Sequence, residues 1–220
     1  MHFSRNLQTM SSSCDHIPFS TTKLFSKLIN DYAEGKGSVQ EYVGYAPNIE
    51  GYKAAIEGRK LYPVNRVLLT EILTTQYAHL QQEAAVNDNI TLLKKENTFV
   101  VTTAHQPNLF SGPLYFFYKI IHAIQLAASL KEQFPQDNFV PVYYMGSEDA
   151  DLDEVGAFNI EATKYNWSTK QTGAIGRMKV DDALLKLIQQ LEGYWSSMPK
   201  GQKALAILKE AYQKGKTINE

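Results

Sequence analysis

Residues 98–112 read TFVVTTAHQPNLFSG, and residues 138–151 read NFVPVYYMGSEDAD. Each stretch begins with an apolar run typical of a buried strand, at 99–103 and at 139–145, and then continues into a polar loop. Between the two lies a long apolar segment that starts at Pro113 and has the composition of a buried helix. Strand, helix and strand in this order predict one β-α-β crossover, and hence an α/β fold with a parallel sheet at its core.

The two polar loops are the place where chemistry is expected. Strands joined by a crossover helix run parallel, so both loops leave the sheet at the same edge, which is where open α/β sheets bind their ligands. We therefore expect the first loop to face the second, with His105, Gln106 and Asn108 opposite Glu148, Asp149 and Asp151.

The start of the apolar helix adds to this predicted site. Ser111 or Gly112 can cap the helix, and Pro113 suits its first position. The unpaired backbone N–H groups of the first turn would then point into the same crevice, where they favour a carboxylate or a phosphate. Lys119 follows within the apolar helix, and we expect its ammonium either to contact that anion or to form an ion pair with the acidic loop.

The acidic loop has two interpretations. Its carboxylates, Glu148, Asp149, Asp151, Asp153 and Glu154, suit either a Mg²⁺ ion carried by a nucleotide or the protonated amine of a substrate. No His or Cys accompanies them, so no zinc site is expected.

His105 has three possible roles at the end of the first strand. It can act as a general base, hydrogen-bond an anionic ligand, or bond the neighbouring backbone. Gln106 and Asn108 are either ligand contacts or amides that stabilise the loop. The aromatic residues nearby (Tyr115, Phe116, Phe117, Tyr118, Tyr143 and Tyr144) are expected in the core, and Pro141 is expected at the first ladder position of its strand, since proline is poorly tolerated inside a sheet.

The rest of the chain divides into two further regions. Residues 1–95 are expected to form a helical N-terminal segment that packs on the core, residues 96–160 to form the core, and residues 161–220 to begin an inserted or connecting region. Helical patterns occupy the N-terminal region at 21–35, 39–43, 48–61 (interrupted by Gly51 and Gly58), 64–83 and 88–95. Strand-like composition at 158–160, 164–167 and 174–180 precedes two helices, the first capped by Asp181 or Asp182.

Composition narrows the class of protein. The chain has 220 residues, 44% of them hydrophobic, and a net charge of −1, which argues against sequence-independent nucleic-acid binding and favours small-molecule ligands. The single cysteine, Cys14, is expected to be an incidental thiol, and the apolar helix carries too many polar residues to lie in lipid. We expect a cytoplasmic protein that binds no membrane. Since a doubly wound sheet needs four or more parallel strands and two are found, the chain is expected to be the N-terminal part of a longer protein.

The run TTAHQPNLFSGPLYFFYKI followed by VPVYYMGSEDADLDEV resembles the bacillithiol biosynthesis cysteine-adding enzymes, the cysteine ligases of the BshC family. The family pattern is similar to G-Q-Q-x-G-L-F-T-G-P-L-Y before the helix and G-E-D-H-D after the second strand. Glutamine is usual in the family at the position of His105, which favours a hydrogen-bonding role there over proton transfer. The family's two glycines are replaced by Ala104 and Asn108, and its histidine by Ala150.

This resemblance implies a Rossmann-like core that a later portion completes, with a coiled-coil arm and a homodimer in the full-length protein. The implied reaction is addition of L-cysteine to the amino group of glucosaminyl-malate, with ATP or ADP and Mg²⁺ as possible cofactors. His105, Glu148, Asp149 and Asp151 are the catalytic residues that we would assign, and Gln106, Asn108, Ser111, Gly112 and Lys119 the substrate-binding ones. Two alternatives are a nucleotide- or sugar-binding Rossmann-like module without ligase chemistry and a helical scaffold.

Overall fold

The structure is a computed structural model that describes residues 15–80, 83–160 and 162–220. Cys14 and the serine-rich residues before it lie outside this part of the chain. The chain divides into two compact units, Met1–Val64 and Asn65–Glu220. The predicted site falls entirely within the second unit.

The first unit is helical, as the apolar periodicity predicts, but the pattern expected at 21–35 is divided between two helices, with Lys23 left-handed between them. It contains α1 (Phe19–Thr22), α2 (Lys27–Glu34), the 3-10 helix η1 (Ser38–Tyr42) and α3 (Ile49–Lys60). The side chain of Asn48 caps α3 by accepting a hydrogen bond from the Gly51 N–H. The predicted interruption of this helix is wrong, since α3 continues through both Gly51 and Gly58. Position 51 needs a glycine because a Cβ atom there would come within 1.8 Å of the Ala46 carbonyl oxygen.

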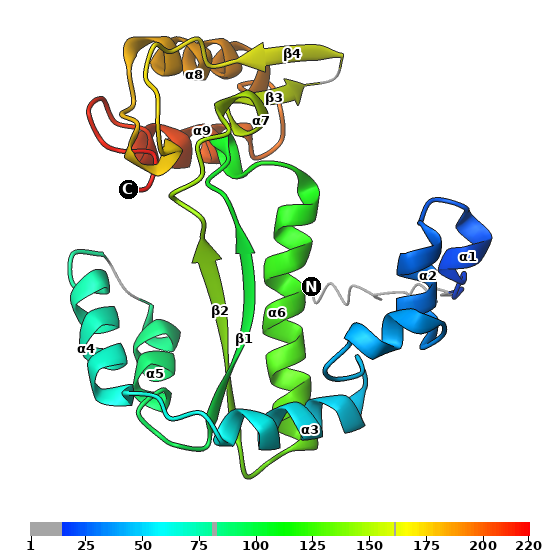
Figure 1. Ribbon diagram of the computed structural model, residues 1–220. Helices are drawn as coiled ribbons and strands as arrows, with labels where there is room; N and C mark the ends of the chain where they lie inside the picture. The colour runs from blue at the N-terminus through cyan, green and yellow to red at the C-terminus, as the bar shows by residue number, and fades with distance from the viewer. Residues whose placement is uncertain (1–14, 81–82, 161) are drawn as a thin grey trace, which may run out of the picture. The chain divides into compact units, whose positions relative to one another are not determined.

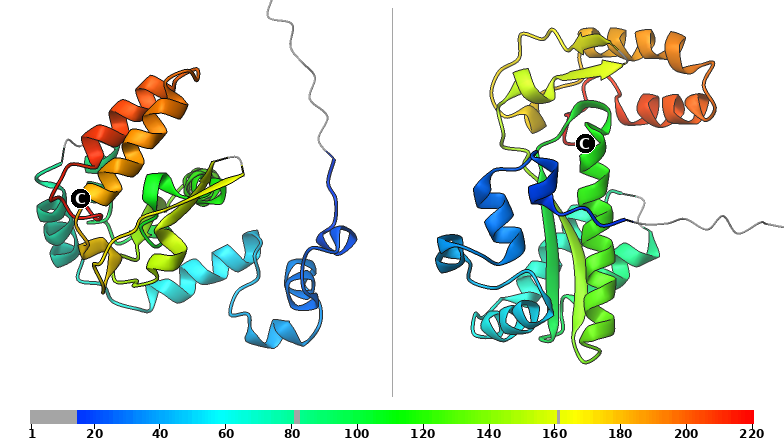
Figure 2. Two further views of the ribbon diagram at one scale, coloured as in Figure 1. Left: turned by 90° about the horizontal axis from the view of Figure 1, so that it is seen from above. Right: turned by 90° about the vertical axis from the view of Figure 1, so that its right-hand side faces the viewer.

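The centre of the second unit is the predicted β-α-β crossover. Strands β1 (Thr98–His105) and β2 (Asn138–Met145) run parallel, in a register that places Thr98 opposite Asn138 and His105 opposite Met145. Helix α6 (Leu114–Gln133) connects them and contacts both strands, lying alongside them in Figure 1 and in the right-hand view of Figure 2. The buried face of α6 is a stripe of small and apolar side chains, Ala123, Ala127 and Leu130. The α/β class and the parallel pairing are therefore confirmed.

Pro141 lies inside the β1–β2 ladder, opposite Val101, and the prediction that it occupies the first ladder position is wrong. Within the described residues, β2 pairs with β1 alone. A proline is tolerated in such a strand when its nitrogen faces the unpaired side, because no ladder hydrogen bond is then lost. The sequence pattern could not show that β2 has only one partner here.

Two helices lead into β1. They are α4 (Arg66–Tyr77), which ends earlier than predicted, and α5 (Ala84–Leu92). The Arg66 guanidinium donates hydrogen bonds of 3.0, 3.1 and 3.0 Å to the carbonyl oxygens of Leu93, Glu96 and Thr98. One side chain thus fixes the start of α4 against the end of α5 and the first residue of β1. No helix of the described residues is long and apolar enough to cross a bilayer.

The C-terminal elements follow β2 at its carboxyl end. They are α7 (Leu152–Val155), the antiparallel strands β3 (Ala157–Ile160) and β4 (Thr163–Asn166), the 3-10 helix η3 (Ile175–Arg177), α8 (Asp182–Trp195) and α9 (Gly201–Ala211). The prediction of a strand at 174–180 is wrong, since η3 and a single β-bridge between Lys179 and Thr217 occupy it. Most of these elements share one hydrophobic core, which includes Val155, Trp167, Ile175, Leu184 and Leu187, and also Leu109 from the loop after β1.

Asp181 organises the polar side of this core. Its carboxylate caps α8 through the Leu184 N–H (2.9 Å) and accepts hydrogen bonds from Trp167 Nε1 (2.8 Å) and Thr169 Oγ1 (2.7 Å). Desolvation by burial acts to raise the pKa of Asp181, but these hydrogen bonds outweigh it and hold the pKa below its ordinary value of 3.8. Because its pKa is lowered on folding, Asp181 stabilises the folded state at neutral pH, and this contribution is lost as the pH falls below 3.8 toward the folded-state pKa.

We expect Asp181→Ala to lower the free energy of unfolding by about 2–3 kcal/mol, because it removes a helix cap and leaves the buried Trp167 N–H without its partner. Urea denaturation at pH 7 measures the loss. The matched control is Asp182→Ala, which removes a neighbouring carboxylate. Its ion pair with Lys214 is exposed, so a change below about 0.5 kcal/mol is expected. Equal losses in the two variants would contradict this account.

Candidate functional site

The loop after β1 has an unusual backbone. Phe110, Ser111 and Gly112 all have left-handed conformations, with φ of 54°, 67° and 66°. For the two residues other than glycine, this conformation costs roughly 1–2 kcal/mol each. At Gly112 only glycine fits, because a Cβ atom there would lie 2.7 Å from the Cβ of Asn108. The loop therefore turns sharply between β1 and α6, and something else must hold it in this form.

The turn is supported by the hydrophobic core that the C-terminal elements share, called the C-terminal core below. The Phe110 N–H donates a hydrogen bond of 3.0 Å to Tyr212 Oη, and the Phe110 ring packs edge-on against Phe158 at 4.8 Å. The Leu109 side chain is buried in the same core. Burial raises the pKa of Tyr212, so its hydroxyl stays protonated at neutral pH. The sharp turn is thus held by residues about fifty and a hundred positions further along the chain.

The predicted helix caps are wrong. Pro113, with φ of −72° and ψ of 158°, occupies the N-cap position of α6, rather than Ser111 or Gly112, and the first helical residue is Leu114. An N-cap residue needs an extended backbone, whereas Ser111 and Gly112 are left-handed. Among the residues that the structure describes, no side chain caps α6.

The imidazole of His105 has a protein partner at each ring nitrogen. Asn108 Nδ2 lies 2.8 Å from Nδ1, and the Gln106 carbonyl oxygen lies 3.0 Å from the same atom. Nε2 is hydrogen-bonded to the hydroxyl of Tyr115, in the first turn of α6. The ring also meets Phe116 edge-to-face at 5.8 Å. His105 is therefore fixed in orientation by its own loop and by the helix that follows.

The acidic loop is held by backbone hydrogen bonds from η3. The Ile175 N–H donates to the Asp149 carbonyl oxygen (2.8 Å), and the Gly176 N–H donates to the Ser147 carbonyl oxygen (3.2 Å). Gly176 packs so closely that a Cβ atom would lie 2.6 Å from Ser147 Cβ. Within the loop, Asp149 Oδ1 accepts from the Asp151 N–H at 2.9 Å. These contacts fix the backbone of the acidic loop, so Glu148 and Asp149 are held just beyond the carboxyl end of β2.

The two loops meet at the carboxyl edge of the strands. The Gly146 N–H and the Tyr143 hydroxyl both donate to the His105 carbonyl oxygen, at 2.9 and 3.0 Å, so the pairing of the strands continues into the loops. An open pocket of about 260 Å³ lies there, lined by Ala104, His105, Gln106, Tyr144, Gly146, Glu148 and Asp149. The expected juxtaposition of the two loops is present in the structure.

The predicted site residues divide into those that line this pocket and those that do not. His105, Gln106, Glu148 and Asp149 line it. Asn108 lies behind His105 and also donates to the Gln106 carbonyl oxygen at 3.1 Å. Asp151 caps α7 by accepting from the Glu154 N–H at 3.2 Å, and Ser111 and Gly112 form the left-handed turn.

Lys119 lies one turn after Tyr115 on α6. Its ammonium donates a hydrogen bond to the Ala104 carbonyl oxygen, at the end of β1. Within the described residues, no ion pair joins it to a carboxylate, so the predicted alternative of an ion pair with the acidic loop is wrong. The charge of Lys119 is therefore not neutralised by a side chain in this part of the chain.

The aromatic residues around the site were predicted to be core, and for several of them this is wrong. Tyr115, Phe117, Tyr118 and Tyr144 are all exposed. Tyr144 lines the pocket and donates a hydrogen bond of 3.3 Å to Glu148 Oε1, and Tyr115 binds His105. The helical spacing of Tyr115 and Lys119, four residues apart, is the signal that could have placed Tyr115 on the same face as a residue already assigned to the site.

Comparison with known proteins identifies relatives over nearly the whole chain. The model of the family described as "Bacillithiol biosynthesis BshC, N-terminal Rossmann-like domain" matches residues 12–220. A protein of Flavobacterium psychrophilum named "Putative cysteine ligase BshC" is 42% identical over 74% of this chain and 32% of its own length. Proteins of the same name from Cytophaga hutchinsonii and Bacillus thuringiensis are 35% and 33% identical, over 94% and 58% of this chain and 38% and 24% of their own lengths. The chain thus spans about a third of the length of the first of these relatives.

We expect Tyr212→Phe to destabilise the turn that precedes α6, because the Phe110 N–H loses its acceptor while the left-handed backbone remains. The expected loss in unfolding free energy is about 1 kcal/mol, with faster amide hydrogen exchange at residues 109–112. Tyr165→Phe is the control, since it removes a hydroxyl from the same core for which no hydrogen bond is found in the described residues. Unchanged exchange at 109–112 in Tyr212→Phe would contradict the role of Tyr212.

Proposed function

The chain belongs to the BshC family, and from this premise we propose that it forms part of a ligase that adds L-cysteine to the amino group of glucosaminyl-malate in bacillithiol biosynthesis. The names of its relatives support the reaction class. The observation that carries the proposal is the pocket in which residues from both polar loops meet at the carboxyl edge of two parallel strands.

The proposed reaction joins an amine to a carboxyl group. The nitrogen of glucosaminyl-malate forms a bond to the carbonyl carbon of an activated cysteine carboxyl, the leaving group departs from that carbon, and the nitrogen loses a proton. Such a reaction depends on holding the amine and the acyl group in the correct orientation and on stabilising charge. The arrangement of the pocket suits the first of these tasks, because one side carries the carboxylates of Glu148 and Asp149 and the other carries the amide of Gln106 and the imidazole of His105.

We assign the amine to the acidic side. Glu148 and Asp149 line the pocket and have no cationic side chain paired with them in the described residues, so a protonated amine would supply the missing charge. One of these carboxylates would then accept the proton that the nitrogen loses. Asp151 would support them from behind, through its backbone N–H to Asp149.

We assign the malate carboxylates to the opposite side. Gln106 lines the pocket there, and Lys119 brings a positive charge to the end of β1. Asn108, Ser111 and Gly112 set the course of the loop between them. A carboxylate placed near the start of α6 would also be favoured by the free N–H groups of the first helical turn.

The full-length protein, incubated with L-cysteine and glucosaminyl-malate, should form bacillithiol, which mass spectrometry detects as a new thiol. Reactions with and without ATP and Mg²⁺ identify the energy source. Absence of the product under all conditions, together with normal bacillithiol in a deletion strain, would reject the ligase. Thermal stabilisation by unrelated nucleotides alone would instead indicate a binding module without ligase chemistry.

The variants Glu148→Gln and Asp149→Asn should each raise the KM for glucosaminyl-malate by about 10-fold or more, since each removes a charge that would bind the amine. The matched control is Asp153→Asn, which makes the same change on α7, at an exposed residue that does not line the pocket. Its KM should stay within twofold of the wild-type value. Similar kinetics in all three variants would show that the acidic loop does not bind the amine.

A further inference from the structure

Tyr115 lies at the end of a chain of hydrogen-bonded side chains that begins inside the loop. Asn108 contacts His105 Nδ1, and His105 Nε2 contacts the Tyr115 hydroxyl. Both ring nitrogens of His105 therefore face protein groups, whereas Tyr115 is 48% exposed. Of the three linked residues, Tyr115 is the one classed as exposed, and it therefore connects the loop to the surface of α6.

The direction of the hydrogen bonds follows from Asn108. Its amide nitrogen has two hydrogens and two acceptors within reach, the Gln106 carbonyl oxygen at 3.1 Å and His105 Nδ1 at 2.8 Å. Nδ1 can bond only one of its two neighbours, since the Asn108 amide nitrogen is a donor and the Gln106 carbonyl oxygen, 3.0 Å away, is an acceptor. We assign the ring hydrogen of His105 to Nε2, because Nδ1 then accepts the shorter bond from Asn108 and the Gln106 carbonyl oxygen is still bonded by the other Asn108 hydrogen. Nε2 donates to the Tyr115 oxygen, and the hydroxyl hydrogen of Tyr115 is left to donate to a group outside the loop.

Lys119 places a positive charge on the same face of α6. Residues four apart on a helix are neighbours on its surface, so Tyr115 and Lys119 share one face of α6. Both are anchored to consecutive residues of β1, Lys119 to the Ala104 carbonyl oxygen and Tyr115 to the His105 ring. A hydroxyl donor beside an ammonium that lacks a carboxylate partner in the described residues is a combination that recognises an anion.

From this geometry we propose that Tyr115 and Lys119 form a carboxylate-binding subsite, and that His105 positions the Tyr115 hydroxyl rather than transferring a proton. The naming of the malate group as the occupant rests on the proposed function. Tyr115 is then a substrate-binding residue. A glutamine at position 105 could also position its hydroxyl, because a glutamine amide can donate to the same oxygen.

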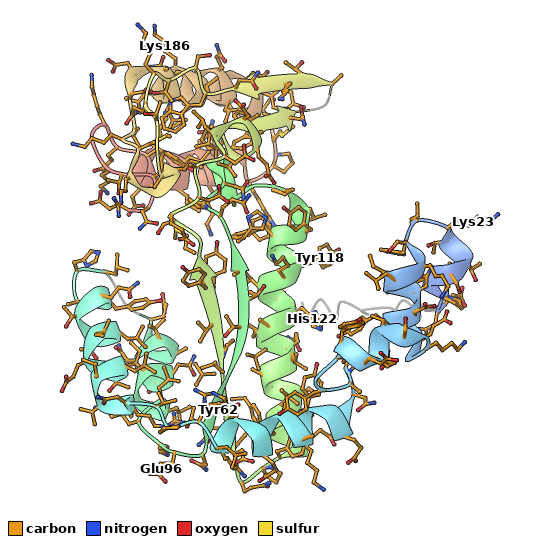
Figure 3. The ribbon with its side chains drawn as sticks, viewed as in Figure 1. Lys23, Tyr62, Glu96, Tyr118, His122 and Lys186 are labelled. Atoms are coloured by element: carbon orange, nitrogen blue, oxygen red, sulfur yellow. The ribbon has the colours of Figure 1, made fainter. Side chains whose placement is uncertain are left out.

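The control residue is Tyr118, which lies three positions after Tyr115 on α6. Tyr118 is 67% exposed, and within the described residues no hydrogen bond to its hydroxyl is found. Figure 3 shows Tyr118 and His122 on the side of α6 that faces away from the strands. Tyr118→Phe therefore removes the same hydroxyl group from the same helix without touching the proposed subsite.

The test is calorimetric titration of the full-length protein with glucosaminyl-malate, L-malate and, separately, ATP. Tyr115→Phe should weaken binding of both malate ligands by about 10-fold or more, the effect expected for loss of a hydrogen bond to a charged group, and Tyr118→Phe should bind as the wild type does. His105→Gln should stay within threefold of the wild type, whereas His105→Leu should match Tyr115→Phe. Circular dichroism confirms that each variant is folded.

Three results would overturn the subsite. They are binding of malate ligands by Tyr115→Phe within twofold of the wild type, equal losses in His105→Gln and His105→Leu, and no binding of either malate ligand by the wild type. If Tyr115→Phe weakens the binding of ATP alone, the subsite binds a phosphate rather than a carboxylate, and the assignment to malate is rejected. Binding that depends on Tyr115 without any addition of cysteine would reject the ligase and leave the subsite in place.

Discussion

The parallel register of β1 and β2 is the constraint on which the site depends. His105 and Met145 are opposite each other at the last ladder position, and the His105 carbonyl oxygen then accepts from the Gly146 N–H just beyond it. Because both strands end at the same level, the polar loop and the acidic loop leave the sheet together and line one pocket. A shift of one residue in this register would turn the side chains of one strand to the opposite face and separate the two loops.

The loop geometry near this edge is unfavourable by itself. Two non-glycine residues in left-handed conformations would not persist in an isolated segment, and the C-terminal core stabilises them through Tyr212, Phe158 and the buried Leu109. The acidic loop is supported in a similar way by η3. The C-terminal elements therefore act as the frame that fixes both loops, and this accounts for their packing at the carboxyl end of the strands, visible in Figure 1.

The side chains of the proposed subsite and the residues that anchor them belong to a helix and a strand rather than to loops. His105 and Ala104 end a strand, and Tyr115 and Lys119 lie in the first two turns of a helix, so their hydrogen bonds join β1 directly to α6. Such a connection keeps polar groups in place without a bound ligand, because each is already hydrogen-bonded to a neighbouring element. The exposed apolar side chains of α6, which include Leu114, Phe117 and Ile121, lie outside these contacts.

The sequence by itself determined the order of strand, helix and strand, the parallel pairing, and the meeting of His105 and Gln106 with Glu148 and Asp149, because apolar runs and the crossover rule depend only on local pattern. Only the tertiary structure decided the left-handed turn, the replacement of the predicted cap by Pro113, and the exposure of Tyr115. The turn and the cap depend on contacts such as that between Phe110 and Tyr212, which are 102 positions apart. No local pattern records a contact of that separation. The exposure of Tyr115 has a different cause, since which face of α6 is covered depends on the elements that pack against it.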